Sequence, residues 1–484
     1  MSEKTLSERA KTAAYKKIVS YLNSDPEKNI PKIMDLLLKY DTKGDITRQV
    51  EVIKWGWDQN TNWGQLLRSF FDDVNPKQRQ RIFEAAVING SLIGFQKQKK
   101  MTAKYKCNMP WAILLDPTSS CNLHCTGCWA SEYGDNLNMS LDTLQDIISQ
   151  AKELGCYIFV YSGGEPLMRK DDIITLCENN QDSIFLCFTN GTLIDEKFAD
   201  EMHRVGNFVP AISIEGFEEA TDSRRGKGTF QRVRKAMDIL QSRKLIYGVS
   251  SCYTSQNYQD IASKEFWDAL CEWGAKFIWL FTYMPVGNDA VPELMVTPEQ
   301  RKYMYEAVRG YRETHPIFSM DFWNDSEYVL GCIAGGRHYF HINANGDIEP
   351  CAFIHYSDSN VYDNTLLEAY TNPLFRAFHD AQPFNENMLR PCPALDNPEK
   401  LEKIIEETGA PSTDFISPED VHDFADKCRL RSEDWGKVAD ELWEVTKERR
   451  PEQFGDEAVA KRDHEWDKNR LHKRYPEEEA IPAK

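Results

Sequence analysis

The sequence predicts an α/β fold built on a parallel sheet, and two observations support this. First, six short apolar runs typical of buried strands alternate with amphipathic stretches typical of helices. Second, glycine-rich or polar residues follow several of these runs, as expected where ligands bind at the carboxyl ends of parallel strands. We expect strands at 111–116, 157–162, 184–189, 209–215, 247–253 and 277–284, and intervening helices at, for example, 140–154, 171–179 and 230–243.

Length, charge and composition limit the classes of protein that the chain can represent. Its 484 residues exceed one ordinary core and predict two or three domains, while 41% hydrophobic residues exclude wholesale disorder. A net charge of −18 argues against a nucleic-acid partner, which needs a basic face. The charged N-terminus lacks an apolar signal segment, so we expect a cytoplasmic protein. For its thirteen cysteines, intracellular thiols that serve metal chemistry fit better than extracellular disulfides.

Three cysteines directly after the first predicted strand form the strongest motif. Cys121, Cys125 and Cys128 have the spacing Cys-x3-Cys-x2-Cys. A loop this short can place three thiolates on three irons of one cubane and leave the fourth iron open. Structural zinc sites usually pair two cysteine knuckles, and unliganded cysteines rarely cluster, so both alternatives fit less well.

This motif resembles the signature of the radical S-adenosylmethionine (radical SAM) superfamily. The resemblance implies a partial (β/α)6 TIM-like barrel and a [4Fe-4S] cluster whose open iron binds S-adenosyl-L-methionine (SAM). It implies reductive cleavage of SAM to a 5′-deoxyadenosyl radical that abstracts hydrogen from substrate, with flavodoxin or ferredoxin as the type of reductant. One departure is Gly127, since the residue before the third cysteine is commonly aromatic in the family; here Trp129 follows Cys128 instead.

A Gly-Gly-Glu-Pro turn at 163–166 follows the second strand and supports this assignment. Paired glycines let the backbone approach a neighbour closely, and Glu165 offers a carboxylate at a strand end. By the resemblance, Gly163, Gly164 and Glu165 bind the methionine end of SAM. The further SAM-binding residues that it implies are Asn190, Ser213, Glu215, Arg225, Ser250 and Val286. A strand serine can instead satisfy a backbone group, and Arg225 can be a solvated loop residue.

A second set of cysteines surrounds a predicted β-hairpin. Strands on either side of an Asn-Gly turn at 345–346 would bring Cys332 and Cys351 together. The block resembles the SPASM and twitch extensions of radical SAM enzymes, which bind auxiliary clusters. Because the denser cysteine group of a full SPASM extension is missing, we expect one auxiliary [4Fe-4S] cluster. Its expected ligands are Cys332, Cys351 and Cys392, with Cys428 as the candidate fourth; a hairpin without metal is the alternative.

The remaining cysteines and the hairpin histidines are interpreted more simply. Single cysteines in strand or helix patterns are expected to be small core residues: Cys156, Cys177, Cys187, Cys252 and Cys271. Ordinary packing or surface exposure is favoured over metal ligation for His338, His341 and His355.

Four regions are expected along the chain. They are an N-terminal helical domain (1–105), the barrel (106–320), the auxiliary iron–sulfur domain (321–430) and a charged helical or flexible tail (431–484). Within 85–106 an apolar segment runs into five lysines. This pattern allows peripheral contact with an anionic membrane, although a solvated, lysine-rich helix end is the simpler interpretation.

The predicted function is that of a radical SAM enzyme with one auxiliary cluster, acting on a peptide or protein as is common for SPASM extensions. Two alternative substrates keep the same chemistry: a lipid alkyl chain at the membrane surface, oxidised or coupled through carbon, and a small metabolite. A non-catalytic iron–sulfur electron carrier or sensor is the alternative of another class. The 163–166 turn argues against it, because an electron carrier has no use for a SAM site.

Overall fold

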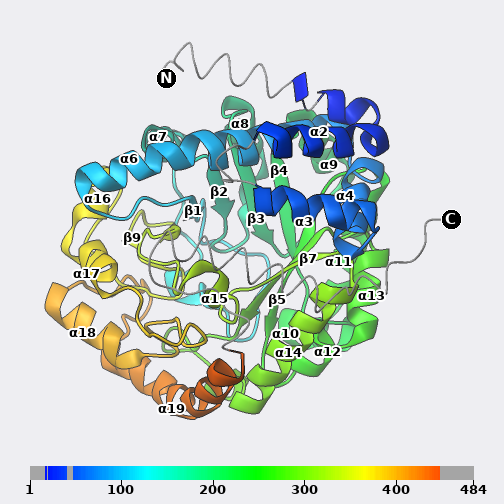
Figure 1. The fold of residues 1–484 in the computed structure, drawn as a ribbon. Coiled ribbons are helices and arrows are strands. Elements are labelled where there is room, and N and C mark those ends of the chain that lie inside the picture. The colour runs from blue at the N-terminus through cyan, green and yellow to red at the C-terminus, as the bar shows by residue number, and fades with distance from the viewer. Residues whose placement is uncertain (1–16, 19, 41–46, 447–484) are drawn as a thin grey trace.

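The computed structural model describes residues 17, 18, 20–40 and 47–446, which build a nine-stranded sheet surrounded by helices (Figure 1). The strands are β1 (Ala112–Leu115), β2 (Ile158–Tyr161), β3 (Ile184–Thr189), β4 (Phe208–Ser213), β5 (Gly248–Tyr253), β6 (Phe277–Thr282), β7 (Phe318–Asp321), β8 (Tyr339–Ile342) and β9 (Ile348–Glu349). Their order is β7-β6-β5-β4-β3-β2-β1-β8-β9. Every pairing is parallel except β8 with β9, so the fold is the predicted α/β partial barrel.

All six predicted strands are confirmed, with ends shifted by two residues at most. Successive side chains of a strand point to opposite faces of the sheet. In β1, Ile113 and Leu115 pack in the main core beneath the outer helices. Ala112 and Leu114 point the other way, into the barrel interior. Both faces are therefore covered, which explains why these strands are continuous apolar runs rather than alternating ones.

The outer layer consists of helices that follow the strands. They are α7 (Leu141–Leu154), α8 (Lys170–Asn179), α9 (Glu196–Val205), α10 (Glu218–Arg225), α11 (Thr229–Ser242), α12 (Tyr258–Ile261), α13 (Lys264–Glu272) and α14 (Pro298–Thr314). Helix α7 shows how sequence sets their ends. The Ser140 side chain caps its first turn by accepting from the Thr143 N–H, and Gly155 ends it with a φ of 97°. The predicted helices at 140–154, 171–179 and 230–243 are confirmed.

The predicted helical character of the N-terminal region is confirmed for its described residues. The helices are α2 (Pro26–Tyr40), α3 (Thr47–Asp58), α4 (Asn62–Asp72), α5 (Pro76–Ile82), the π-helical η1 (Phe83–Gly94) and α6 (Phe95–Tyr105). Val74 and Ala85 pack in one apolar cluster with Ile158 and Ile184, the first residues of β2 and β3. This cluster covers the amino ends of the strands.

The C-terminal part continues the barrel sheet. The predicted hairpin is confirmed as β8 and β9, with His341 opposite Glu349, and β8 lies beside β1 with Tyr339 opposite Ala112. The helices that accompany it are α15 (Ser326–Val329), α16 (Leu366–Thr371), α17 (Pro373–Ala381), α18 (Pro398–Thr408) and α19 (Val421–Val445).

The expected division into four regions stays a prediction. The boundary after residue 320 falls inside β7, and the boundary after 430 falls inside α19, which continues to Val445. The expected tail beyond Thr446 lies outside the described residues. Among the described helices, none combines the length and apolarity that a membrane crossing requires.

Candidate active site

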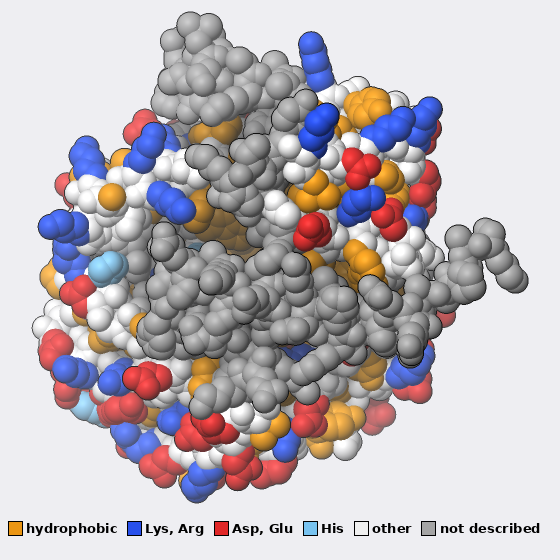
Figure 2. Space-filling model, viewed as in Figure 1, with side chains coloured by type: hydrophobic (Ala, Val, Ile, Leu, Met, Phe, Trp, Pro, Cys, Tyr) orange, Lys and Arg blue, Asp and Glu red, His pale blue; other side chains and the backbone are white. Residues whose placement is uncertain are grey.

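The barrel encloses a cavity of about 990 Å³. Its lining is mainly apolar and includes Leu114, Val160, Phe188, Trp279 and Phe281 from four strands, and Phe322, which directly follows β7. Seen from outside, the surface beside α6 is hollowed, with hydrophobic side chains in the hollow (Figure 2). A cavity of this size and composition is typical of a small-molecule site.

Cys121, Cys125 and Cys128 lie together at the end of this cavity that is formed by the carboxyl ends of the strands. Burial raises the pKa of Cys121 to about 11 and raises that of Cys128, so both are thiols at neutral pH and lose their protons on binding metal. Among the described residues, no group of three His, Cys, Asp or Glu side chains is close enough for a single metal ion. A cubane distributes its ligands over separate irons, so three neighbouring thiols can hold a cluster without meeting at a single ion.

The predicted glycine turn packs against the cysteine loop. The Gly164 N–H donates to the Thr118 carbonyl (3.0 Å), and the Glu165 N–H donates to the Ser120 carbonyl (2.8 Å). A Cβ at Gly163 would lie 2.6 Å from the Thr118 oxygen, and one at Gly164 would lie 2.3 Å from the Ser120 oxygen. We expected the glycines to approach a ligand; the close neighbour that the structure shows is the backbone just before Cys121.

The Glu165 carboxylate is buried and held by three donors. It accepts hydrogen bonds from the Thr189 hydroxyl (2.6 Å) and from the backbone N–H groups of Leu167 (3.0 Å) and Asn190 (2.7 Å). Burial raises the pKa of Glu165, and these bonds oppose the rise. Glu165 also lines the cavity, so a fixed carboxylate stands near the cysteines.

Glu215 has a different place from the one expected. It does not line the cavity, and its Oε1 instead accepts from Arg224 (2.7 Å) and Arg225 (2.8 Å to Nε). The two arginines line the cavity, and Arg225 Nη1 lies 3.9 Å from the Cys125 sulfur. Glu215 therefore holds two cations beside the cysteine loop because all three groups are buried together. Sequence reasoning found Arg225 and missed Arg224, whose only signal was its place next to Arg225.

The other expected SAM contacts divide into two groups. Asn190, Ser213 and Ser250 line the cavity at the ends of β3, β4 and β5. Val286 does not; it is buried in an apolar cluster with Tyr283 and Met284. Tyr283, which sequence reasoning missed, lines the cavity and packs against Gly127.

A second cavity of about 420 Å³ adjoins the first and is lined by Cys332, Cys351 and Cys392. Burial raises the pKa of Cys351 to about 12 and that of Cys392 to about 11. Cys428 is fully buried in one apolar cluster with Cys351, and it interacts electrostatically with Cys392. It does not line this cavity. Tyr339 lines both cavities, and its hydroxyl is 2.6 Å from the Cys351 sulfur. The structure thus brings Cys332 and Cys351 together as expected, with Cys392 at the same cavity, and the ligand set itself stays a prediction.

The remaining cysteines are mostly packing residues, whereas two of the three histidines form buried ion pairs, His341 with Asp116 and Glu349, and His355 with Asp414. Cys156, Cys177 and Cys187 are buried, and Cys271 is half-buried on α13. Cys252 differs from the expectation of a core residue because it lines the main cavity. His341 and His355 are buried, whereas His338 is half-buried and lines the cavity.

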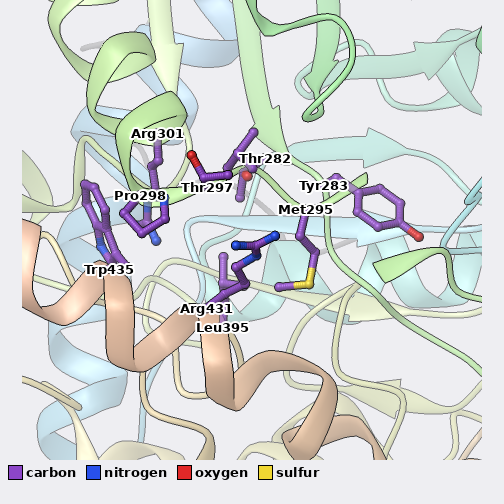
Figure 3. A pocket seen from close by; sticks show the side chains of 10 residues that line it. Thr282, Tyr283, Met295, Thr297, Pro298, Arg301, Leu395, Arg431 and Trp435 are labelled. Atoms are coloured by element: carbon purple, nitrogen blue, oxygen red, sulfur yellow. The ribbon is translucent and has the colours of Figure 1, made fainter. Parts of the chain in front are cut away.

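A third, small cavity of about 20 Å³ lies between the end of β6, α14 and α19 (Figure 3). The Arg301 guanidinium lies 4.2 Å from the Trp435 ring and is paired with Asp396 (2.6 Å). The space is large enough for about one water molecule, so it is no candidate for the substrate site.

Comparison with known proteins places this site in a family. The family described as the Radical SAM superfamily matches residues 115–263, which contain the three cysteines and the glycine turn. The chain belongs to the radical SAM superfamily. It is accordingly an enzyme of a family that uses a [4Fe-4S] cluster and SAM, and Cys121, Cys125 and Cys128 fit the cluster.

Two curated relatives come from Methanosarcina barkeri. The chain is 29% identical to Fe-coproporphyrin III synthase over 174 residues. This alignment covers 35% of this chain and 41% of that protein. It is 22% identical over 305 residues to AdoMet-dependent heme synthase, covering 57% of this chain and 86% of that protein. The chain therefore spans about two fifths of the length of the first relative.

A solved structure shares the fold. Streptococcus suis SuiB bound to S-adenosylmethionine is 18% identical, with a TM-score of 0.52 over 71% of this chain and 84% of SuiB.

Proposed function

We propose that this radical SAM enzyme abstracts hydrogen from a substrate with a large apolar body that occupies the 990 Å³ cavity. The observation that carries the proposal is the position of Cys121, Cys125 and Cys128 at one end of that mainly apolar cavity. These residues would hold the [4Fe-4S] cluster. When bound, the cluster and SAM supply the reductive cleavage that makes hydrogen abstraction possible.

The chain's own residues prepare the site for a charged ligand. Glu165, fixed by three donors, offers a carboxylate to an ammonium group. Arg224 and Arg225 line the same cavity and can attract a carboxylate while Glu215 holds them in place. SAM carries both an ammonium and a carboxylate, so this paired arrangement supports SAM binding at the cysteine end. Asn190, Ser213 and Ser250 supply hydrogen-bonding groups at the neighbouring strand ends.

Away from the cysteines the lining favours an apolar substrate. Inward-facing aromatic residues such as Trp279, Phe281 and Phe322 offer few polar groups. The names of the two relatives point in the same direction, since a porphyrin combines an apolar macrocycle with carboxylate side chains. A lipid alkyl chain meets the same physical requirement, because its burial among these side chains is driven by the hydrophobic effect.

A peptide remains the second candidate because of the resemblance to SPASM extensions. The lining of the cavity limits how a peptide could bind, because a peptide backbone needs hydrogen-bonding partners. An extended peptide brings backbone N–H and C=O groups that need partners wherever water is excluded. The aromatic lining supplies few of these, so we expect that only a peptide side chain would enter the cavity.

The second cysteine set supports one auxiliary cluster. Cys332, Cys351 and Cys392 surround a cavity that adjoins the substrate cavity, and Tyr339 stands between the two. We propose that Cys332, Cys351 and Cys392 would hold an auxiliary cluster, which would supply either an electron-transfer centre or a substrate-binding iron beside the substrate cavity. Four cysteine ligands favour the first role, and three favour the second.

The test is SAM cleavage by anaerobically reconstituted enzyme. Reduction with dithionite in the presence of SAM should yield methionine and 5′-deoxyadenosine, measured by chromatography. Replacing all three cysteines (Cys121→Ala, Cys125→Ala, Cys128→Ala) should abolish the product, whereas Cys271→Ala on α13 should not. Wild-type enzyme that carries iron but forms no 5′-deoxyadenosine would contradict the proposal and favour an electron carrier or sensor.

A further inference from the structure

The end of the main cavity opposite the cysteines carries positive charge. The cysteine loop follows the carboxyl end of β1, whereas Arg337 and His338 precede β8, which runs parallel to β1. The His338 carbonyl accepts from the N–H groups of Trp111 (2.8 Å) and Ala112 (2.9 Å), at the amino end of β1. Since β1 has four residues, about 13 Å of strand separates the two ends.

Helix α6 forms the other wall of this end. Phe95, Lys99, Thr102 and Ala103 line the cavity, and their spacing places them on one face of the helix. The helix is anchored beside β2 by the Gln98 side chain, which donates to the Gly155 carbonyl (2.9 Å). Lys99 therefore reaches the same cavity end as Arg337 from a fixed element.

These two cations have no carboxylate among the described residues. Neither Lys99 nor Arg337 takes part in any ion pair found in the part of the chain that the structure describes. The Arg337 guanidinium instead donates to the carbonyls of Cys332 (2.9 Å) and Val329 (2.7 Å). By contrast, the cations at the cysteine end, Arg224 and Arg225, are both paired with Glu215.

The surroundings of Arg337 make an anionic ligand favourable there. The side chain is half-buried, so its charge is partly removed from solvent. His338 beside it is neutral, since burial and the Arg337 charge lower its pKa to about 4. A partly desolvated cation without a carboxylate partner gains from an anion that can reach it.

We propose that Arg337 and Lys99 bind an anionic group of the substrate, which is therefore an amphiphile with a carboxylate or phosphate at one end and an apolar body along the barrel. The inference rests on the proposed function. That function places the apolar body of the substrate near the cysteines, and the inference adds a binding site for the anionic group of the same molecule. The anionic group enters last, and the carbon to be attacked lies deeper, roughly the length of β1 away.

Exposed apolar residues surround the same mouth. Phe95, Trp111 and Val329 line the cavity and are 43%, 41% and 41% exposed. Figure 2 shows the hollow with orange side chains and lysines nearby on α6. An apolar entrance with cations at its rim admits an apolar body first and retains the charged head outside.

The test measures binding to reconstituted enzyme without dithionite, by quenching of tryptophan fluorescence. The probes are palmitate with its methyl ester, and iron coproporphyrin III with its tetramethyl ester. At least one acid should bind about tenfold more tightly than its ester, and the pair that shows this distinguishes a fatty acyl chain from a porphyrin.

Variants locate the site. Arg337→Gln and Lys99→Gln should weaken binding of the acid and leave that of the ester unchanged, and Arg337→Lys should keep the preference for the acid. Lys403→Gln, an exposed change on α18, should have no effect. Circular dichroism verifies that each variant is folded.

Three results would overturn the inference: equal binding of acid and ester, equal weakening of both by the variants, or no binding of any probe. Failure of the proposed function looks different. Wild type that prefers the acids but forms no 5′-deoxyadenosine contradicts the proposed function alone. Wild type that forms it yet does not distinguish acid from ester contradicts this inference alone.

Discussion

The ring of Tyr283 occupies the space above Gly127, the residue before the third cysteine of the loop. A Cβ at Gly127 would lie 2.6 Å from Tyr283 Cε2, and the glycine has a φ of 65°. Tyr283 follows β6 and lines the cavity, and its hydroxyl accepts from the Val291 N–H (2.9 Å). An aromatic ring from a distant strand end thus lies where the sequence itself offers only glycine.

We expect Gly127→Ala to destabilise the cysteine loop. The left-handed backbone costs a side chain about 1–2 kcal/mol, and the contact with Tyr283 adds to this. The measurements are the midpoint of urea unfolding and the iron content after reconstitution, both of which should fall. Gly310→Ala is the control, because Gly310 lies in α14 with open space around it. The double variant Gly127→Ala/Tyr283→Ala should regain part of the lost stability and iron content. If it regained neither, the contact with Tyr283 would not be the cause of the loss.

Gly164→Ala should separate the glycine turn from the cysteine loop. Its Cβ would lie 2.3 Å from the carbonyl oxygens of both Ser119 and Ser120, and backbone cannot yield as a side-chain tip can. We expect iron loading and SAM affinity to fall together, measured by iron analysis and equilibrium dialysis with labelled SAM. Normal iron content with weakened SAM binding alone would show that the turn does not support the loop.

His341 is held between two buried carboxylates, and its removal should be costly. Its ring nitrogens lie 2.8 Å from Asp116 and 2.6 Å from Glu349. His341→Gln leaves these two acids without their shared cation, which should reduce the free energy of unfolding by about 3–5 kcal/mol. His379→Gln, at an exposed position of α17, is the matched control. A loss no larger than that of the control would mean that the cation does not hold these strands.

The same cluster predicts a pH dependence. The two carboxylates raise the pKa of His341 to about 10 against the opposing effect of burial, while an unfolded histidine titrates near about 6.5. The folded protein therefore binds a proton that the unfolded chain releases, so this stability is complete below pH 6.5 and is lost as pH rises toward 10. Urea titrations of wild type and His341→Gln across this range should converge at high pH; parallel curves would contradict the assignment.

Cys428→Ser should decide how many ligands the auxiliary cluster has. Cys428 is fully buried next to Cys392, so we expect it to complete a four-cysteine site and the variant to lose about four irons per chain. Iron analysis and electron paramagnetic resonance of the reduced protein measure this. Cys271→Ser is the control. An unchanged iron content would instead assign three cysteine ligands and an open iron facing the 420 Å³ cavity.

The local sequence pattern was sufficient to locate most strands and helices of the barrel. Strands such as β2 are short apolar runs bounded by turn residues, and α7 begins at a serine cap and ends at a glycine, so both could be located from neighbours in the chain. Strand β7 was missed because its alternating run, Phe-Ser-Met-Asp, is only four residues long and is hard to distinguish from a loop by sequence. It forms because β6 offers it an edge.

The sequence by itself determined the cysteine motif, the glycine turn and the alternation of strands and helices, because each depends on residues close together in the chain. Only the tertiary structure decided that Glu215 holds Arg224 and Arg225 rather than lining the cavity, and that Tyr283 covers Gly127. It also placed Lys99 and Arg337 at one cavity end. The physical reason is that a charge or a ring acts through its neighbours in space, and burial brings together groups from distant strand ends that no local spacing records.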